Sequence, residues 1–153
     1  PFIALGLELL LDSRAIEHKE TRFSGLRLRY IDAFGDNLRQ GKSLTNFLGE
    51  DLGIRIQIPQ AISQFCSDPN AVRPNLSVSM PIKLGTLELK VSEGWVRNAR
   101  TLVMDTTVLC KGPIDAKMES VLVTLSDAHQ VIHDSFVGMT QSLHHLMEPE
   151  VTN

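Results

Sequence analysis

Apolar residues recur at steps of three and four along the last part of the chain. After Met118 the series continues through Leu122, Leu125, His129, Ile132, Phe136, Met139, Leu143 and Leu146, with His129 as its polar member. This spacing keeps the side chains on one face of a helix. Pro113 and Asp115 precede the first turn, and Pro149 follows the last. The pattern predicts an amphipathic helix of about thirty residues within 115–150.

Before this helix, apolar and polar residues alternate in several short runs, a pattern typical of strands. We predict strands over residues 2–11, 23–34, 54–58, 78–82, 87–92 and 101–110. For the first run a helix is the competing interpretation, because leucine and glutamate are good helix formers. Pro81 makes its run an edge or interrupted strand. The link at residues 98–100 predicts a hairpin.

One short helix is predicted between the second and third of these strands. Ser43 precedes apolar residues at helical spacing, and Gly53 follows them, which indicates a capped helix over residues 44–52. Residues 60–75 are rich in proline and asparagine and read as a loop. Within that loop we expect Ile62 and Phe65 to hold the segment against the core.

These elements predict one α+β domain. An antiparallel sheet of about five or six strands packs against one long C-terminal helix, and one short helix accompanies them. The 153 residues suit a single domain. The chain begins at Pro1 within what reads as the middle of a longer sequence, so we expect a truncated N-terminus. If the predicted helix face is core, Phe136→Ala should cost about 3–5 kcal/mol.

Composition and charge narrow the classes of function. The formal net charge of −3 argues against a dedicated nucleic-acid binder, which needs a basic excess. Charge is uneven, however, because basic residues gather within 14–42 and acidic residues within the predicted long helix. Cys66 and Cys110 lack the spacing of a metal or redox motif, so we expect free thiols in the cytoplasm. No run is apolar for long enough to predict a membrane span.

Two stretches resemble a sporadically distributed family of conserved, uncharacterised prokaryotic proteins. The run Leu26-Arg27-Leu28-Arg29-Tyr30-Ile31-Asp32 is similar to the family's Leu-Arg-Tyr-Ile-Asn strand. The last predicted helix supplies the second match, with Leu125, His129, Ile132 and Phe136. Asp32 stands where the family usually has asparagine. The family brings no established activity, so the resemblance implies a fold and an N-terminal extension rather than a function.

Several residues are candidates for binding. Arg27 and Arg29 share one strand face and are candidates to bind a phosphate or carboxylate. The favoured alternative is a pair of salt bridges within the sheet. Tyr30 and His129 join Arg29 as polar contacts of a pocket that we hypothesise between sheet and long helix.

Metal and nucleic-acid sites are less favoured. His129 and His133 lie one helical turn apart, yet two ligands do not complete a zinc site, so a structural role is the favoured interpretation and we expect no metal and no cofactor. Trp95, with Arg97 and Arg100, has the chemistry to stack on a base. An ordinary hairpin end is the favoured alternative for these three residues, given the acidic total charge.

The first hypothesis for function is a non-enzymatic interaction or assembly module that forms a homo-oligomer, with a dimer as the first guess. Its interface would be a second stripe of small residues on the long helix, suited to close packing. That stripe consists of Val121, Ala128, Ser135 and Ser142. Another protein is a possible partner, and neither a membrane nor nucleic acid is expected. The alternative is a small-ligand module with the pocket described above; an enzyme is least favoured, because no nucleophile motif is present.

Overall fold

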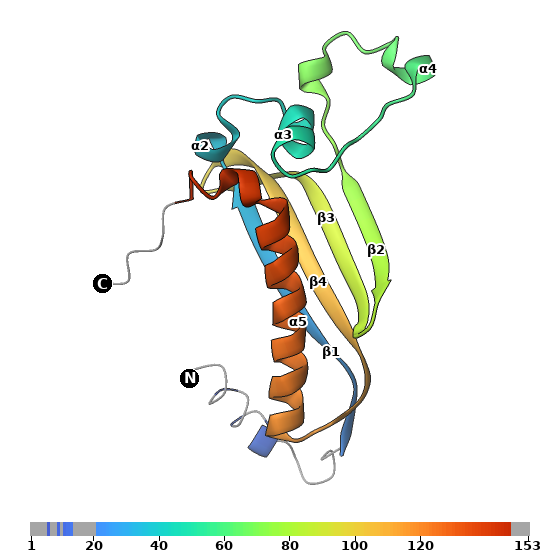
Figure 1. Cartoon of the computed structure of the whole chain (residues 1–153), viewed down its shortest axis with the longest axis vertical. Helices are drawn as coiled ribbons and strands as arrows, with labels where there is room; N and C mark the ends of the chain where they lie inside the picture. The colour runs from blue at the N-terminus through green and yellow to red at the C-terminus, as the bar shows by residue number, and fades with distance from the viewer. Residues whose placement is uncertain (1–5, 7–8, 10, 14–20, 148–153) are drawn as a thin grey trace, which may run out of the picture. The chain divides into compact units, whose positions relative to one another are not determined.

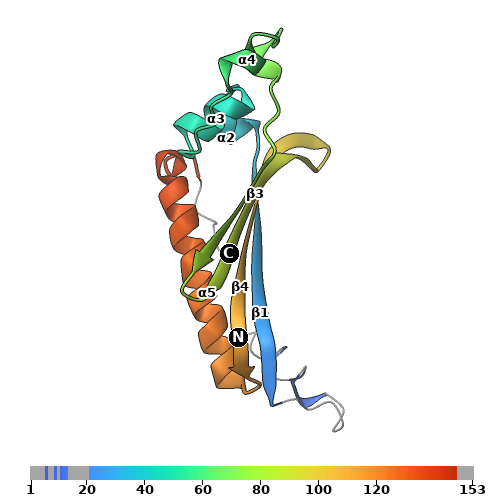
Figure 2. The ribbon, with the colours of Figure 1, turned by 90° about the vertical axis from the view of Figure 1, so that its right-hand side faces the viewer.

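The computed structural model describes residues 6, 9, 11–13 and 21–147. Its elements are β1 (Arg22–Phe34), α2 (Asp36–Arg39), α3 (Leu44–Glu50), α4 (Gln60–Ser63), η2 (Pro69–Ala71), β2 (Leu76–Ile82), β3 (Gly85–Val96), β4 (Ala99–Asp115), α5 (Met118–Met139) and η3 (Gln141–Leu143). The strands form one antiparallel sheet in the order β1-β4-β3-β2, and α5 packs against one of its faces (Figure 1 and Figure 2). The predicted α+β class is therefore confirmed.

The sheet has four strands among the described residues, fewer than the five or six predicted. The prediction over residues 2–11 is wrong where it can be compared, because Gly6, Leu9 and Leu11 are helical. The amide of Ser13 donates a hydrogen bond to the carbonyl of Leu9 at 2.9 Å, as in a helix. Helix propensity thus prevails over alternation there. The other residues of that run lie outside the described part of the chain.

The strand predicted over residues 54–58 is also absent from the structure. The amide of Ile54 donates to the carbonyl of Leu48 at 2.7 Å, directly after α3, and its side chain packs against buried residues. Ile56 and Ile58 are 41% and 38% exposed. The sequence alternates as a strand does, but no neighbouring strand pairs with this segment.

Local signals are confirmed elsewhere. β2 lies at an edge of the sheet, as Pro81 predicted. β3 and β4 form the predicted hairpin through Arg97 and Asn98, whose φ values of 49° and 66° suit a two-residue turn with both central residues left-handed. Ser43 caps α3, since its Oγ accepts a hydrogen bond from the amide of Asn46 at 3.3 Å.

The long helix is shorter than predicted. Pro113 and Asp115 belong to the end of β4, and α5 begins only at Met118. The carboxylate of Asp115 lies 3.3 Å from Nε of Arg22 on β1, so it joins two strands instead of capping the helix. α5 ends at Met139, and a short turn of 3-10 helix follows. The predicted terminator Pro149 lies outside the described residues.

The chain divides into two compact units, which we describe separately. Unit 1 takes residues from 1–30, 78–88 and 106–133. Its core is a cluster from β3, β4 and α5, with Leu26 and Leu28 of β1 packed against it. The buried members are Leu87, Val108, Cys110, Ile114, Ala128 and Ile132.

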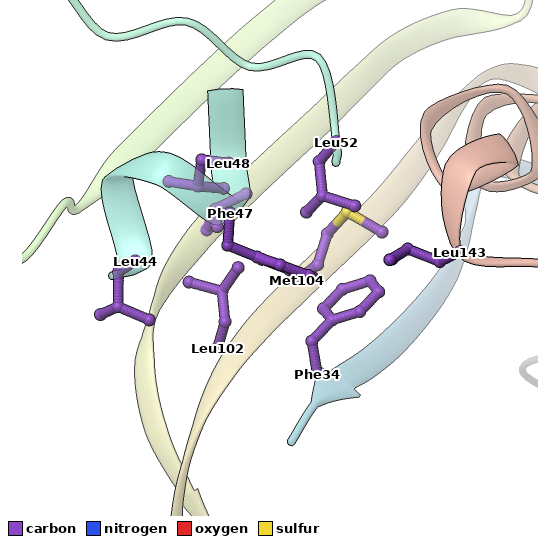
Figure 3. Packing of buried hydrophobic residues seen from close by; sticks show 9 residues of the cluster. Phe34, Leu44, Phe47, Leu48, Leu52, Leu102, Met104 and Leu143 are labelled. Carbon is purple, nitrogen blue, oxygen red and sulfur yellow. The ribbon is translucent and has the colours of Figure 1, made fainter. Parts of the chain in front are cut away.

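Unit 2 takes residues from 31–77, 89–105 and 134–153 and has a core of its own. Nine buried residues form it: Phe34, Leu44, Phe47, Leu48, Leu52, Val91, Leu102, Met104 and Leu143. Figure 3 shows side chains from α3, the sheet and the segment after α5 pointing toward one another. α3 contributes Leu44, Phe47 and Leu48, the residues whose helical spacing predicted it. This core fixes the chain segments on which the site described below is built.

The buried face of α5 differs from the predicted one. Within unit 1, Val121, Ala128 and Ile132 are at most 3% exposed, whereas His129 is exposed. Adjacent residues on a helix point about 100° apart, so Ala128 and His129 cannot both face the sheet. Small side chains let a helix approach its neighbour closely. Val121 and Ala128 of the small-residue stripe are therefore buried together with Ile132 of the predicted apolar face, whereas His129 is not.

Candidate functional site

The structure does not bring the predicted ligand-binding residues together. Leu26 and Leu28 pack against the core on the helix-covered face of β1, and Tyr30 lies on that face as well. Arg27 and Arg29 alternate with these residues and therefore lie on the opposite face of the strand. Arg29 also interacts already with another residue of the chain. A pocket lined by Arg29, Tyr30 and His129 together is therefore wrong.

Tyr30 and His129 do meet in unit 1. The Tyr30 hydroxyl lies 3.0 Å from Nδ1 of His129, and the ring of His133 lies 6.0 Å from that of His129, measured between centroids. The structural interpretation of His129 stays a prediction, and the side chain is exposed and not part of a buried helix face. Among the described residues, no group of three or more His, Cys, Asp or Glu side chains is arranged to hold a metal ion.

The predicted partner stripe is also wrong as an exposed surface. Val121 is 1% exposed and Ala128 is 0% exposed, because both pack inside unit 1. Ser135 is partly buried, and the hydroxyl of Ser142 donates a hydrogen bond to the backbone carbonyl of Asp51 at 2.8 Å. These residues contribute to the fold of the chain itself.

A different group of polar residues surrounds a hollow in unit 2, which we call the basic hollow. Its volume is about 590 Å³. The lining residues are Arg39, Gly41, Lys42, Ser43, Leu44, Asn46, Asn70, Ala71, Val72, Arg73, Glu93 and Arg100. Four of these side chains are cationic and one is a carboxylate. Three carboxylates outside the lining also pair with Arg39 or Lys42 and offset part of the positive charge, those of Asp36, Glu50 and Asp51.

A left-handed turn brings the first two cations to the hollow. Gln40 and Gly41 have φ values of 50° and 77°, and this conformation ends α2 directly after Arg39. The amide of Lys42 then donates to the carbonyl of Arg39 at 3.0 Å. Glycine adopts positive φ without steric cost, which explains Gly41 in this turn. The chain thus places Arg39 and Lys42 on either side of a tight reversal, just before α3.

Arg39 is the most enclosed of the four cations. Its side chain is only 14% exposed, and it pairs with the carboxylate of Asp36, which is 82% exposed. Nε of Arg39 is shut off from solvent and has no hydrogen-bond partner. A buried N–H without an acceptor is costly, so such a group calls for an explanation.

Lys42 is held by two carboxylates. Its Nζ lies 2.7 Å from Oδ2 of Asp51 and 3.3 Å from Oε2 of Glu50. The hydrogen bond to Asp51 raises the pKa of Lys42, burial opposes this, and the bond to Glu50 adds to the increase. Lys42 is therefore a fixed positive charge at neutral pH, although the two carboxylates offset part of its field.

Glu93 holds the other two cations. Its Oε2 lies 3.5 Å from Nη1 of Arg73, and its Oε1 lies 3.6 Å from Nη1 of Arg100. These distances are long for hydrogen bonds, so the three groups form ion pairs. A guanidinium carries five N–H donors, and the ion pairs with Glu93 engage few of them. Glu93 thus positions two arginines whose remaining donors can reach a further acceptor.

The basic hollow suits anions rather than cations or apolar molecules. Guanidinium groups bind phosphate and carboxylate through paired, charge-assisted hydrogen bonds. The amides of Asn46 and Asn70 and the hydroxyl of Ser43 add neutral polar groups to the lining. Within the described part of the chain, two further hollows in unit 2 have one charged lining residue between them, Asp51. The basic hollow is thus the better candidate for a charged ligand.

Sequence reasoning missed this site because its cations come from separate segments. Arg39 and Lys42 belong to the region recognised as rich in basic residues, and Arg100 had been noted beside Trp95. Arg73 lies in a stretch predicted as loop. No local spacing connects these residues, since the fold of unit 2 brings them together.

No family model, curated protein or solved structure matches the chain. The resemblance to the prokaryotic family stays a prediction. In the part of the chain that the structure describes, no helix is both long and apolar enough to cross a membrane.

Proposed function

We propose that this chain is a small-ligand-binding module and that its ligand is an anion bound in the basic hollow. The observation that carries the proposal is the grouping of four cationic side chains around one hollow of unit 2, those of Arg39, Lys42, Arg73 and Arg100. A volume of about 590 Å³ suits a small molecule. The proposed binding site is therefore the basic hollow, and not the pocket between sheet and long helix that we hypothesised from the sequence.

Pyrophosphate is a suitable first probe, since it presents several charged oxygens without other chemistry. We expect it to raise the melting temperature of the protein more than sodium chloride does at the same ionic strength, because a ligand that binds the native state stabilises it. Arg39→Met and Arg73→Met should each weaken binding about tenfold to a hundredfold, the value of a hydrogen bond to a charged group.

Arg27→Met is the matched control. It removes one positive charge from the exposed, helix-free face of β1 in unit 1 and leaves the lining of the hollow intact. Its affinity for pyrophosphate should equal that of the unmodified protein. Equal stabilisation by pyrophosphate and by sodium chloride would overturn the proposal, and a loss of binding in Arg27→Met would move the site to the sheet face.

A second candidate function is assembly of the chain into a homo-oligomer, and a different surface favours it. Every residue from Arg55 to Ala71 is exposed, including Ile62 at 63% and Phe65 at 82%. The segment contains the unpaired run of alternating isoleucines described above. Exposed apolar groups of this kind are typical of interaction sites. We propose that a second copy of the chain covers them.

Charge and symmetry support a second copy as the occupant. In an antiparallel pair of identical segments centred on Ile56, each Arg55 stands opposite a Gln57, so no like charges face each other. Sedimentation equilibrium should show a dimer, and Ile56→Asp with Ile58→Asp should dissociate it. Val123→Asp, at a 56% exposed position on α5, is the control and should leave the dimer intact. A monomer at high concentration would contradict this second proposal.

A further inference from the structure

Arg100 connects Trp95 with the basic hollow. Trp95 stands near the end of β3, just before the hairpin turn at Arg97 and Asn98. The Cζ atom of Arg100, across the hairpin, lies 5.4 Å from the centroid of the indole ring. Arg100 also lines the hollow and pairs with Glu93. Its guanidinium therefore touches both an aromatic ring and the positively charged cavity.

Trp95 is unusually open to solvent for a tryptophan. Its exposure is 67%, although tryptophan is among the residues most buried on average. The cation–π contact joins the indole to Arg100, a lining residue, and leaves most of the ring uncovered. Most of a large flat apolar surface is thus available to a ligand that already contacts Arg100.

We propose that the anion bound in the basic hollow is the phosphate of a nucleotide and that its base stacks on Trp95; this inference rests on the proposed function. Arginine side chains bind phosphate oxygens, and an exposed aromatic ring stacks on a base. An inorganic phosphate or a simple carboxylate would use the cations and leave the indole uncovered. A nucleotide carries both groups at once, joined by a sugar whose hydroxyls match the polar lining.

The mode of phosphate binding is set by side chains. No Gly-rich phosphate-binding motif occurs in the sequence. Recognition rests instead on Arg39, Lys42, Arg73 and Arg100, with the amides of Asn46 and Asn70 nearby. Because every base has a π face, stacking on Trp95 should discriminate little between bases. We therefore expect the site to select for a nucleoside phosphate as a class.

Two sources can supply this chemistry: a free mononucleotide or the end of a single-stranded nucleic acid. The net charge of −3 favours the free mononucleotide, because tracking a polyanion needs positive charge beyond one hollow. The lining provides that charge at one place, with four cations and one carboxylate. We commit to the mononucleotide and let the experiment test the other source.

Trp95 is the only tryptophan in the chain, so tryptophan fluorescence reports on this ring alone. Adenosine monophosphate should change the fluorescence of the full chain in a saturable way. Pyrophosphate should stabilise the protein against heat and leave the fluorescence nearly unchanged. Trp95→Leu should weaken nucleotide binding, measured by calorimetry, about fivefold to a hundredfold and leave pyrophosphate binding intact. Trp95→Phe should restore most of the loss.

The other possible results of these binding experiments distinguish failure of the nucleotide inference from failure of the proposed function. If pyrophosphate binds but Trp95→Leu binds adenosine monophosphate as tightly as the unmodified protein, the nucleotide inference is overturned and anion binding stands. If neither compound stabilises the protein, the proposed function itself fails. Tighter binding of a short 5′-phosphorylated oligothymidylate than of the mononucleotide would overturn the choice of a free mononucleotide. Because Trp95 is exposed, its variants should retain the melting temperature of the unmodified protein, which verifies that they fold.

Discussion

The hydroxyl of Tyr30 on β1 lies 3.0 Å from Nδ1 of His129 on α5, although 99 positions separate the two residues. Their rings are 5.7 Å apart between centroids and tilted by 36°. Tyr30 is 39% exposed and His129 is exposed, so the pair lies at the surface of unit 1. It connects the long helix to a strand at the edge of the sheet.

This contact predicts a modest contribution to stability. Tyr30→Phe removes the hydroxyl and keeps the ring, so it should destabilise the protein by about 0.5–1.5 kcal/mol in denaturant unfolding. The low end is expected because water competes at this exposed position. A double-mutant cycle with His129→Ala isolates the pair. A coupling energy of zero would show that the hydrogen bond contributes nothing to the native state.

Local patterns in the sequence predicted most of the elements. Ser43 indicated the start of α3, and Pro81 indicated an edge strand; both depend on a few neighbouring residues. The position of the buried face of α5 was not predictable in the same way. The apolar series was predicted to face the core and the small-residue stripe to face a partner, but the buried residues come from both, with Ile132 from the series and Ala128 from the stripe.

The basic hollow is harder to predict than the fold because its residues meet only through the tertiary structure. Arg39 and Arg100 are 61 positions apart in the sequence (100 − 39). No local sequence motif connects residues at such a distance. Arg27 and Arg29, in contrast, are close in sequence and share a strand face, which made them the more visible candidates. Their spacing in the sequence indicated a shared face of β1, but that face is opposite to the helix-covered face on which Tyr30 lies.

The core of unit 2 gives a sharp prediction at Phe47, which is 0% exposed and contacts Phe34 with ring centroids 5.6 Å apart. Phe47→Ala should cost about 3–5 kcal/mol, because it removes a large side chain and leaves a cavity. Val123→Ala is the control at 56% exposure and should change the unfolding free energy by at most about 0.5 kcal/mol. Phe136 is only partly buried, so its truncation should cost less than that of Phe47.

Two glycines should respond oppositely to alanine. Gly85, at the start of β3, has a φ of 144°, and a Cβ there would stand 2.2 Å from the carbonyl oxygen of Leu109. Gly85→Ala should therefore lower the denaturant midpoint strongly, because the backbone at Leu109 would have to move away from the added Cβ. Gly49 lies in α3, where an added Cβ meets nothing within 4 Å. Gly49→Ala should stabilise the protein by about 0.5–1 kcal/mol. Equal effects of the two substitutions would contradict the strand geometry at Gly85.

Asp32 predicts a pH-dependent stability. Burial raises the pKa of its carboxyl above the ordinary value. Because the folded pKa exceeds the unfolded one, the native state holds this proton more tightly, and the resulting stability is full below the unfolded pKa and is lost as pH rises through the folded pKa. At neutral pH the charged carboxylate of Asp32 therefore destabilises the native state.

Asp32→Asn should raise the melting temperature at about pH 7, because it removes the buried charge. The advantage should shrink as the pH falls through the raised pKa of the folded state, and it should be lost below about 4, where the carboxyl is protonated in both the folded and the unfolded chain. Melting temperatures of both proteins measured across this range test the expectation. A lower melting temperature for Asp32→Asn at about pH 7 would mean that the carboxylate has a stabilising partner in the native state that outweighs its desolvation.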